Sequence, residues 1–586
     1  MRARLERIFG SRFAIPALIA IALALAATSL DTGHVADDWV HQLLVSGHPL
    51  AGMTTRPLDL FTFATGDPQK THALIDQGVF PWWADPTVKL SFFRPISSLT
   101  HAVDHALWPG SAALEHAHNL LWFGLALLVV AAVYRRFLQP SWLVGLAVAL
   151  YALDAAHGPA VGWIANRNAM VALALSLPAL ALHDRYRRDG WRPGAWLAPS
   201  VLFIGLLAGE SALATCAYLA AHALCLDRGP LARRLARLWP YALVVVLWRI
   251  IYHALGYGAA ASGVYLDPLA QPAAFLALLP RRLSALLAAQ FALPWSDFTA
   301  LYSFFSSRLA REMELVTFLV VAAVAWALWP LLRRDRVARF FAVGLLLSAL
   351  PICATFPADR LLWFVGVGAM GLLAQRIAMP AEGPLLKLAI ALFVLLHLVL
   401  APPLLALRSR SMLTVEAPLA RAERSLPRGP DLAKKTVVIV RAPADLFAGY
   451  LQLTRAARGE PRPAHLRWLT STPSSVELTR LDARTLELRP DGGFLPHASE
   501  QMLRGPEHPL TVGTRIALTG LEIEITSALP DGRPAAARFH FSVPLEDPSL
   551  VWLTWQGTAY HAFQPPPVGA RVTLPALDFA KALFSP

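Results

Sequence analysis

Charged residues are scarce in this chain of 586 residues. Asp, Glu, Lys and Arg make up 16% of it and hydrophobic residues 56%, whereas soluble domains average about 25% charged residues. Long apolar runs recur between residues 13 and 408, which excludes a wholly water-soluble protein. The composition predicts a polytopic membrane protein.

Cysteine is also scarce, with three residues in the whole chain. Cys216 and Cys225 lie in one apolar segment and Cys353 in another, so there is no basis for a disulfide framework and no zinc-like spacing. We expect three small buried hydrophobic side chains. Acidic residues are outnumbered, and the net charge is +13. Much of this excess lies in short basic clusters between spans, where it sets topology or contacts anionic lipids; it need not indicate nucleic acid.

Eleven apolar segments are predicted to span the membrane. They are expected at residues 13–30, 114–134, 141–156, 168–183, 195–209, 211–226, 239–256, 314–332, 340–356, 361–379 and 384–407. A basic segment precedes the first span, as in a signal peptide, but we expect an uncleaved anchor because many spans follow. Two long outer loops are expected at about residues 31–113 and 257–313. The second contains apolar pieces that are too short or too interrupted by proline to span.

The basic clusters also predict the orientation. When the sides of the membrane alternate, every dense arginine cluster falls in the cytoplasm, and Glu210, Asp359 and both long loops fall outside. We therefore expect a bacterial inner-membrane protein with a cytoplasmic N-terminus, a transmembrane domain over residues 1–408 and a periplasmic domain over residues 409–586. Alternating apolar and polar residues predict that this last domain is mostly antiparallel β, with a structural cap favoured over a carbohydrate-binding or scaffold role.

Several short motifs lie at the predicted outer ends of spans. Asp37 and Asp38 form an acidic pair just after the first span. The other motifs are Phe92-Phe-Arg-Pro-Ile96, Val103-Asp-His-Ala-Leu-Trp108, His116-Ala-His-Asn-Leu-Leu121, Ala160-Val-Gly-Trp-Ile-Ala-Asn-Arg167, Gly209-Glu-Ser-Ala-Leu213 and Ala358-Asp-Arg-Leu-Leu-Trp363. In this order they resemble the motifs of the GT-C membrane glycosyltransferases. The most similar variety is the transmembrane O-mannosyltransferases with tetratricopeptide repeats and their bacterial relatives, and the resemblance covers about residues 15–380.

Some positions depart from the family pattern. Pro159 stands where the family has Glu, Asp154 where His is common, Gly209 in place of Lys, and Phe123 in place of a second His. A predicted β domain also stands where the family has its repeats. These departures concern the sugar, the acceptor and the activity, and they leave the expected fold unchanged.

The resemblance implies a hexosyltransferase that moves a sugar, with inversion, from a polyprenyl-phosphate donor to a protein, lipid or polysaccharide on the periplasmic face. Asp37 or Asp38 is expected to be the catalytic base, with Asp38 the second choice, because partial desolvation raises a carboxyl pKa toward the working pH. The alternative is that the pair caps a helix beginning at Trp39. Arginine suits the departing phosphate because it makes bidentate contacts.

Further candidate residues fall on the same outer face. The expected substrate-binding residues are Arg94, Asp104, His116, Asn119, Arg167, Glu210, Arg281 and Arg360. Arg94 is either a contact to donor or acceptor or a loop salt bridge. Asp104 is favoured as structural. Glu210 is expected to pair with Arg167 or Arg360, because a lone buried charge is costly.

A metal site and two other function classes stay open. His116 and His118, with Asp37 nearby, are compatible with a divalent cation such as Mg²⁺ or Mn²⁺, although hydrogen-bonded helix capping is favoured. One alternative function is a transporter or flippase of lipid-linked sugars. Against it, the sequence lacks a Pro- or Gly-broken pair of spans in corresponding halves. The other alternative is a non-catalytic scaffold of the cell envelope on the same fold.

Overall fold

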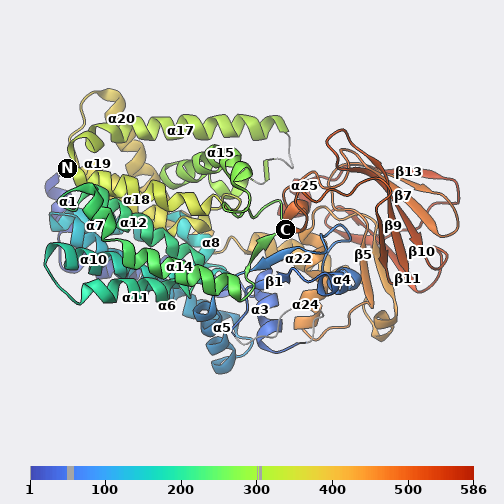
Figure 1. Ribbon diagram of the computed structural model, residues 1–586. Coiled ribbons are helices and arrows are strands. Elements are labelled where there is room, and N and C mark those ends of the chain that lie inside the picture. The colour runs from blue at the N-terminus through green and yellow to red at the C-terminus, as the bar shows by residue number, and fades with distance from the viewer. Residues whose placement is uncertain (1, 49–57, 300, 303–306, 586) are drawn as a thin grey trace.

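The computed structural model describes residues 2–48, 58–299, 301–302 and 307–585. Long helices fill one half of the molecule, with the N-terminus at its far end, and most of the strands fill the other half (Figure 1). The helices of the first half are α1 (Arg2–Phe9), α2 (Ala14–Ala26), α6 (Ala112–Phe137), α7 (Ser141–Ala152), α8 (Gly158–Val161), α9 (Asn168–Ser176), α10 (Pro178–Arg188), α11 (Gly194–Leu206), α12 (Ala214–Cys225), α13 (Leu231–Ala236), α14 (Trp239–Ala254), α15 (Pro272–Phe291), α17 (Ser307–Arg334), α18 (Arg336–Ile352), α19 (Trp363–Ala378), α20 (Pro384–Val394) and α21 (Ala401–Arg408).

Six stretches of helix in the described residues are long and apolar enough to cross a membrane, or seven if one bent pair is a single span. They are Ala14–Asp31, Ala112–Phe137, Ile164–Arg188, Pro272–Phe291, Arg308–Arg334 and Pro384–Arg424, with Ser141–Ala152 and Ala155–Val161 as the pair bent by 41°. A membrane protein is therefore confirmed as the fold class. Helices lie at all eleven predicted places, but several are short, so the count of eleven spans is not confirmed.

The second predicted loop differs from expectation. Residues 257–313 were expected to hold only pieces too short to span, yet α15 is a helix of 20 residues within them. It runs through Pro280, because a proline is tolerated where neighbouring helices satisfy the freed backbone groups. Arg282 in its middle donates to the carbonyl of Cys353, at the end of α18, at 2.8 Å, so α15 is fastened beside the end of that helix.

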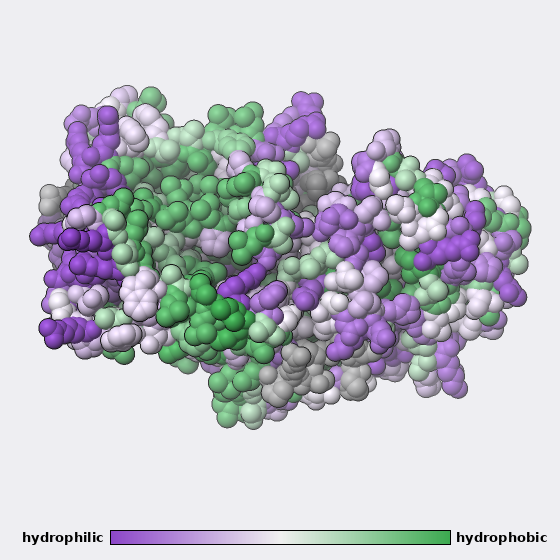
Figure 2. All heavy atoms as spheres, in the orientation of Figure 1, coloured by the Kyte–Doolittle hydropathy of each residue, from purple (hydrophilic) through white to green (hydrophobic). Residues whose placement is uncertain are grey.

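The surface agrees with a membrane-embedded half. Figure 2 shows hydrophobic residues over the helices, between a hydrophilic edge at the far left and the more hydrophilic β-rich part at the right. An apolar band between two polar ends is the pattern that a bilayer requires.

The β-rich half begins with three short strands, which come from the two predicted loops and pair with one another. Strands β1 (Thr62–Thr65), β2 (Lys89–Ser91) and β3 (Gly258–Ala260) form one antiparallel sheet. Short helices flank it: α3 (Asp37–Val45), α4 (Pro68–Gln77) and α5 (Pro95–Leu107). The chain segments on either side of the membrane helices therefore meet in a single layer, which places the end of the first predicted loop beside the start of the second.

Two larger sheets follow in the C-terminal region. An antiparallel sheet has the order β13 (Arg571–Leu574), β6 (Val476–Arg480), β7 (Thr485–Pro490), β10 (Pro534–Phe541), β9 (Leu521–Ala528), β8 (Arg515–Leu518). The second has the order β12 (Ala559–Ala562), β11 (Leu550–Gln556), β4 (Thr436–Ile439), β5 (His465–Trp468). The remaining helices are α22 (Leu413–Arg424), α23 (Leu446–Gly449), α24 (Leu451–Ala457) and α25 (Phe579–Phe584).

Most strand pairs of the C-terminal region are antiparallel, as expected, but in the second sheet β4 pairs in parallel with both β5 and β11. Parallel neighbours need a long crossover, and α23 and α24 supply it between β4 and β5.

The C-terminal region shares one hydrophobic core with the first predicted loop. Side chains between Val40 and Leu90 belong to the same buried cluster as those between Ala422 and Ala582. Trp82 Nε1 donates to the carbonyl of Leu469 at 3.0 Å, and Arg467 Nη2 lies 2.8 Å from Asp76 Oδ1. The predicted domain boundary at residue 408 therefore does not separate two hydrophobic cores, since this cluster contains residues from both sides of it.

Candidate functional site

The acidic pair opens α3, and its two members face different surroundings. Asp38 is 2% exposed, and its carboxylate accepts from the backbone N–H groups of Val35 at 2.9 Å and Ala165 at 2.7 Å. Burial raises the pKa of Asp38 to about 7, against the lowering effect of the Val35 N–H. Asp38 thus ties the start of α3 to the loop before α9.

Asp37 is half-buried and points away from those backbone groups. Its Oδ1 accepts a hydrogen bond of 2.6 Å from the hydroxyl of Tyr450, which precedes α24. Burial raises the pKa of Asp37, while the Tyr450 hydroxyl and the charge of Arg360 oppose that rise. Asp37 is therefore a half-buried residue whose carboxylate has a tyrosine donor and is influenced by the charge of Arg360.

Arg360 lines a cavity of about 490 Å³, and Asp37, whose pKa its charge lowers, lies outside the lining of that cavity. Its guanidinium lies over the rings of Trp163 at 5.2 Å and Phe356 at 5.5 Å, and within the described residues it forms no ion pair with a carboxylate. The cavity is also lined by Asn166, whose buried side-chain nitrogen has no acceptor in that part of the chain. We call this cavity the arginine cavity. It contains a cation without a carboxylate partner, Arg360, and a hydrogen-bond donor without an acceptor, Asn166, among the described residues.

The other charges of the arginine cavity are already paired. Arg94 Nε lies 2.8 Å from Glu210 Oε2, and Arg249 Nη2 lies 2.8 Å from Asp267 Oδ2. The expected partners of Glu210 were Arg167 or Arg360, so its pairing with Arg94 corrects that expectation. Arg94 also stacks on the rings of Phe61 and Phe92, at 4.9 Å and 4.7 Å, which holds its side chain in place.

Arg167 lies outside this cavity in a fully buried network. It is 2.5 Å from Asp104 Oδ2, and it donates to Asn119 Oδ1 and to the carbonyl of Glu115. Asp104 also bonds His118 Nδ1 at 2.5 Å. Four predicted site residues are therefore brought together, but they bind one another and leave no free group for a substrate.

The two histidines at the start of α6 have separate partners. His116 Nε2 lies 3.1 Å from the carbonyl of Gly33, whereas His118 faces Asp104. No group of three His, Cys, Asp or Glu side chains is placed to hold a metal ion in the ranges that the structure describes. His116 and His118 therefore do not form a ready-made ligand set.

Arg281 is separate from the acidic pair. Its side chain is 56% exposed and lies 3.2 Å from Glu314 at the side of α17. Among the substrate-binding candidates, the structure thus brings Arg94, Glu210 and Arg360 to one cavity, places Arg167, Asp104, Asn119 and His116 in buried contacts, and leaves Arg281 at the surface.

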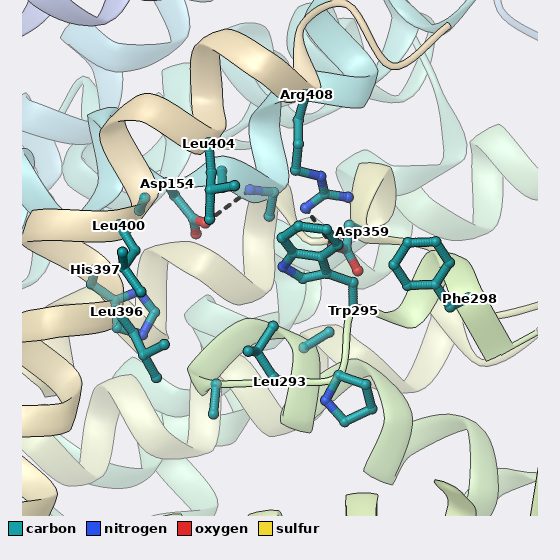
Figure 3. Close-up of a pocket in the computed structure, with 16 residues that line it drawn as sticks. Asp154, Leu293, Trp295, Phe298, Asp359, Leu396, His397, Leu400, Leu404 and Arg408 are labelled. Atoms are coloured by element: carbon teal, nitrogen blue, oxygen red, sulfur yellow. Dashed lines mark hydrogen bonds and ion pairs between the residues drawn. The ribbon is translucent and has the colours of Figure 1, made fainter. Parts of the chain in front are cut away.

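A second cavity, of about 460 Å³, is lined by Asp359, whereas the adjacent Arg360 lines the arginine cavity. Figure 3 shows Trp295 and Phe298 on one side of it and Leu396, His397 and Leu400 on the other, with Asp154 and Arg408 near one end. Arg408 pairs with both Asp359, at 2.6 Å, and Asp297. This cavity is mainly apolar, and its one arginine is neutralised, so it offers nothing for a phosphate.

No protein-family model and no curated protein matches the chain. Several solved structures are similar to it. ArnT from Cupriavidus metallidurans, bound to undecaprenyl phosphate, has 13% identity and a TM-score of 0.38, over 78% of this chain and 90% of that one. The archaeal oligosaccharyltransferase AglB from Archaeoglobus fulgidus, in complex with an inhibitory peptide and a dolichol-phosphate, has 12% identity and a TM-score of 0.38, over 78% of this chain and 65% of that one.

Both TM-scores are 0.38 and both identities are 13% or lower, so neither an activity nor a residue role is transferred from these proteins to this chain.

Three residues of the site were missed by sequence reasoning. Tyr450 lies in a region that carries no catalytic motif, and Asp267 lies in a loop without a pattern. Asn166 was part of a quoted motif but was not singled out. Asp267 had a usable signal, because Arg249 within an apolar helix requires a partner.

Proposed function

We propose that this protein is an inverting membrane glycosyltransferase that uses a polyprenyl-phosphate sugar as donor, with Asp37 as base and Arg360 as the phosphate ligand. The observation that carries the proposal is the guanidinium of Arg360, which lines a cavity without a carboxylate partner in the described residues and whose charge also lowers the pKa of the half-buried Asp37. A cavity of about 490 Å³ lies within the range of about 300–1,000 Å³ typical of ligand pockets. The site would face the periplasm from a bacterial inner membrane.

The phosphate end of the donor suits the arginine cavity. Arg360 supplies bidentate donors to a phosphate, and Asn166 adds a neutral donor on the same wall. Arg94 and Arg249 are held by Glu210 and Asp267, so they shape the cavity rather than supply free charge. Aromatic side chains such as Trp248 and Tyr265 give the same cavity apolar surface for the sugar and the start of the lipid.

The reaction needs a base on the side of the sugar away from the phosphate. The acceptor's hydroxyl gives its proton to Asp37 while its oxygen attacks the anomeric carbon. The bond from that carbon to the phosphate oxygen breaks, and its electron pair leaves on the lipid phosphate, beside Arg360. A raised pKa makes Asp37 a better proton acceptor at neutral pH than an ordinary carboxylate.

Asp37 is assigned as the base in preference to Asp38. Both oxygens of Asp38 already accept backbone N–H groups, and the residue is 2% exposed. Asp37 spends one oxygen on Tyr450 and is half-buried. The acceptor is a hydroxyl-bearing molecule of the envelope, whether protein, lipid or polysaccharide.

The test is sugar transfer by the purified full chain in lipid vesicles, with a panel of labelled polyprenyl-phosphate hexoses and cell-envelope extract as acceptor. Asp37→Asn should lower transfer about 100-fold or more, the usual weight of a general base. Arg360→Met should lower it about 10- to 100-fold, the weight of a charge-assisted contact.

Arg281→Met is the matched control, because this exposed arginine lies away from the cavity, and its transfer rate should stay at the wild-type level. Full transfer by Asp37→Asn would refute the base assignment. A wild-type protein that transfers no sugar from any donor of the panel would refute the glycosyltransferase proposal and favour an envelope scaffold.

A further inference from the structure

The C-terminal region reaches the proposed site through one side chain. Tyr450 lies between α23 and α24, inside the crossover that joins the parallel strands β4 and β5. Its hydroxyl donates to Asp37 Oδ1 at 2.6 Å, across 413 residues of sequence. In Figure 1, α24 lies beside α3, far from the strands at the other end of the domain.

Several neighbouring contacts fix this arrangement. The guanidinium of Arg458, just after α24, lies 4.9 Å from the ring centre of Trp39 on α3. Gln452 donates to the carbonyl of Gln77 at 2.8 Å, and the crossover helices share the buried core of the first loop. Tyr450 is therefore held against Asp37 by packing on both sides of it.

The hydroxyl does two things to the carboxylate. It fixes the orientation of Asp37, and it stabilises the charged form, because a donor lowers a carboxyl pKa. Of the charged groups nearby, Arg360 also lowers the pKa of Asp37. The pKa of the adjacent Asp38 is itself raised by burial. His34 interacts electrostatically with Asp38 and with Arg458.

The geometry points to Tyr450 as a positioning residue that orients the base, which makes the C-terminal domain a part of the active site. This inference rests on the proposed function for its catalytic meaning. It replaces the expectation of a structural cap with a domain that supplies a hydrogen bond to the reacting carboxylate. The docking of the domain would then decide whether the base is correctly placed.

The test is labelling by dicyclohexylcarbodiimide, a small apolar reagent that attacks protonated carboxyl groups, on the full chain in vesicles between pH 5 and 9. Peptide fragmentation by mass spectrometry separates label on Asp37 from label on Asp38. Tyr450→Phe removes only the hydroxyl. It should move the midpoint of Asp37 labelling upward by about one pH unit, since a hydrogen bond to a charged group is lost.

Tyr560→Phe is the matched control. Its hydroxyl is also buried in the C-terminal domain, but it donates to the carbonyl of Phe447 at 3.0 Å and does not touch Asp37. The midpoint should be unchanged in this variant. A midpoint that stays the same in Tyr450→Phe overturns the inference, and so does a wild-type Asp37 that takes no label at any pH, because a base must be reachable.

Labelling needs no turnover, so the two proposals fail separately. A shifted midpoint in a protein that transfers no sugar keeps the Tyr450 contact and refutes the glycosyltransferase. Where transfer occurs, Tyr450→Phe should lower kcat, leave KM unchanged and move the acid limb of the pH–rate profile upward. An unchanged pH–rate profile with full activity overturns the positioning role while the proposed function stands.

Discussion

Asp37 and Asp38 are adjacent on a helix, yet their carboxylates have different partners. Successive side chains on a helix point about 100° apart, so one of the pair turns toward the backbone of Val35 and Ala165 and the other toward Tyr450. The helix-cap alternative is wrong, because α3 begins at Asp37, its N-cap is Ala36, and no side chain caps it. The donors to Asp38 lie outside the helix, and Asp37 is bound by Tyr450 instead.

Two buried or half-buried arginines offer a direct comparison at the residue scale. Arg167→Met would leave Asp104 buried without its arginine, and removing one partner of a buried pair costs about 3–5 kcal/mol. Arg360→Met removes no ion pair formed with the described residues and should cost less than about 1 kcal/mol. The melting temperature of the purified protein should fall clearly in the first variant only. Equal falls in both would show that Arg360 is also structural.

At the scale of elements, the end of α4 is pressed against strand β5. Gly78 closes α4 with φ of +77°, and a Cβ there would lie 2.0 Å from the carbonyl oxygen of Leu466. Only glycine allows both the left-handed backbone and this approach. The contact brings the first predicted loop onto the C-terminal sheet, beside the Asp76–Arg467 pair.

Gly78→Ala should therefore cost more than the backbone term alone. Gly513→Ala is the control, because Gly513 also has a positive φ, of +86°, but no atom lies within 4 Å of its added Cβ. Gly513→Ala should lower the free energy of unfolding by about 1 kcal/mol, the cost of a positive φ for alanine. Gly78→Ala should lower it by about 3 kcal/mol or more, because the clash with Leu466 adds to the same backbone cost. Urea titration followed by tryptophan fluorescence measures both, and equal losses would contradict the close approach.

The loop after β4 carries a half-buried carboxylate whose titration opposes stability. Burial raises the pKa of Asp445 to about 7. An unfolded chain loses this proton near pH 4, so the folded state becomes less stable as pH rises from about 4 to 7, and the loss stays constant above that. Burial also raises the pKa of the nearby Glu500.

Asp445→Asn should thus raise the melting temperature at pH 8 and flatten its fall between pH 5 and 7. The gain is at most about 4 kcal/mol, since one pKa unit corresponds to about 1.4 kcal/mol, and Glu500 keeps part of the slope. Asp431→Asn, at an exposed position, is the control and should leave the pH dependence as it is. A wild-type slope in Asp445→Asn would disprove the assignment.

At the scale of the whole molecule, local patterns predicted local structure well. Apolar runs marked helices at all eleven expected places, and alternation of apolar and polar residues marked strands of the C-terminal region such as β7, β9 and β10. The helix α15 was missed because Pro272, Pro280 and the pair Arg281–Arg282 break its apolar run. Contacts such as Trp82 with Leu469 or Tyr450 with Asp37 join positions hundreds of residues apart, and no local pattern records them.

The site follows the same division. Arg94, Glu210 and Arg360, which the motifs place on one predicted outer face, line one cavity in the structure. The pairing among charges could not be read from the sequence, since Arg94 and Arg167 both had an acidic residue within reach of the predicted face. Burial decided it: Arg167 is enclosed with Asp104, and Glu210 is left to Arg94.

The orientation of the molecule gives a last prediction. Basic clusters between spans favour the cytoplasm, so the loop that contains α13 should lie inside and the C-terminal domain outside. Val568→Cys, at a side chain 59% exposed in that domain, should react with a membrane-impermeant maleimide in spheroplasts of living cells. Leu231→Cys, 47% exposed at the start of α13, should react only after the membrane is permeabilised. The unsubstituted protein, with its native cysteines, is the control for background labelling. Labelling of Leu231→Cys in intact spheroplasts would reverse the orientation and place the arginine cavity on the cytoplasmic side.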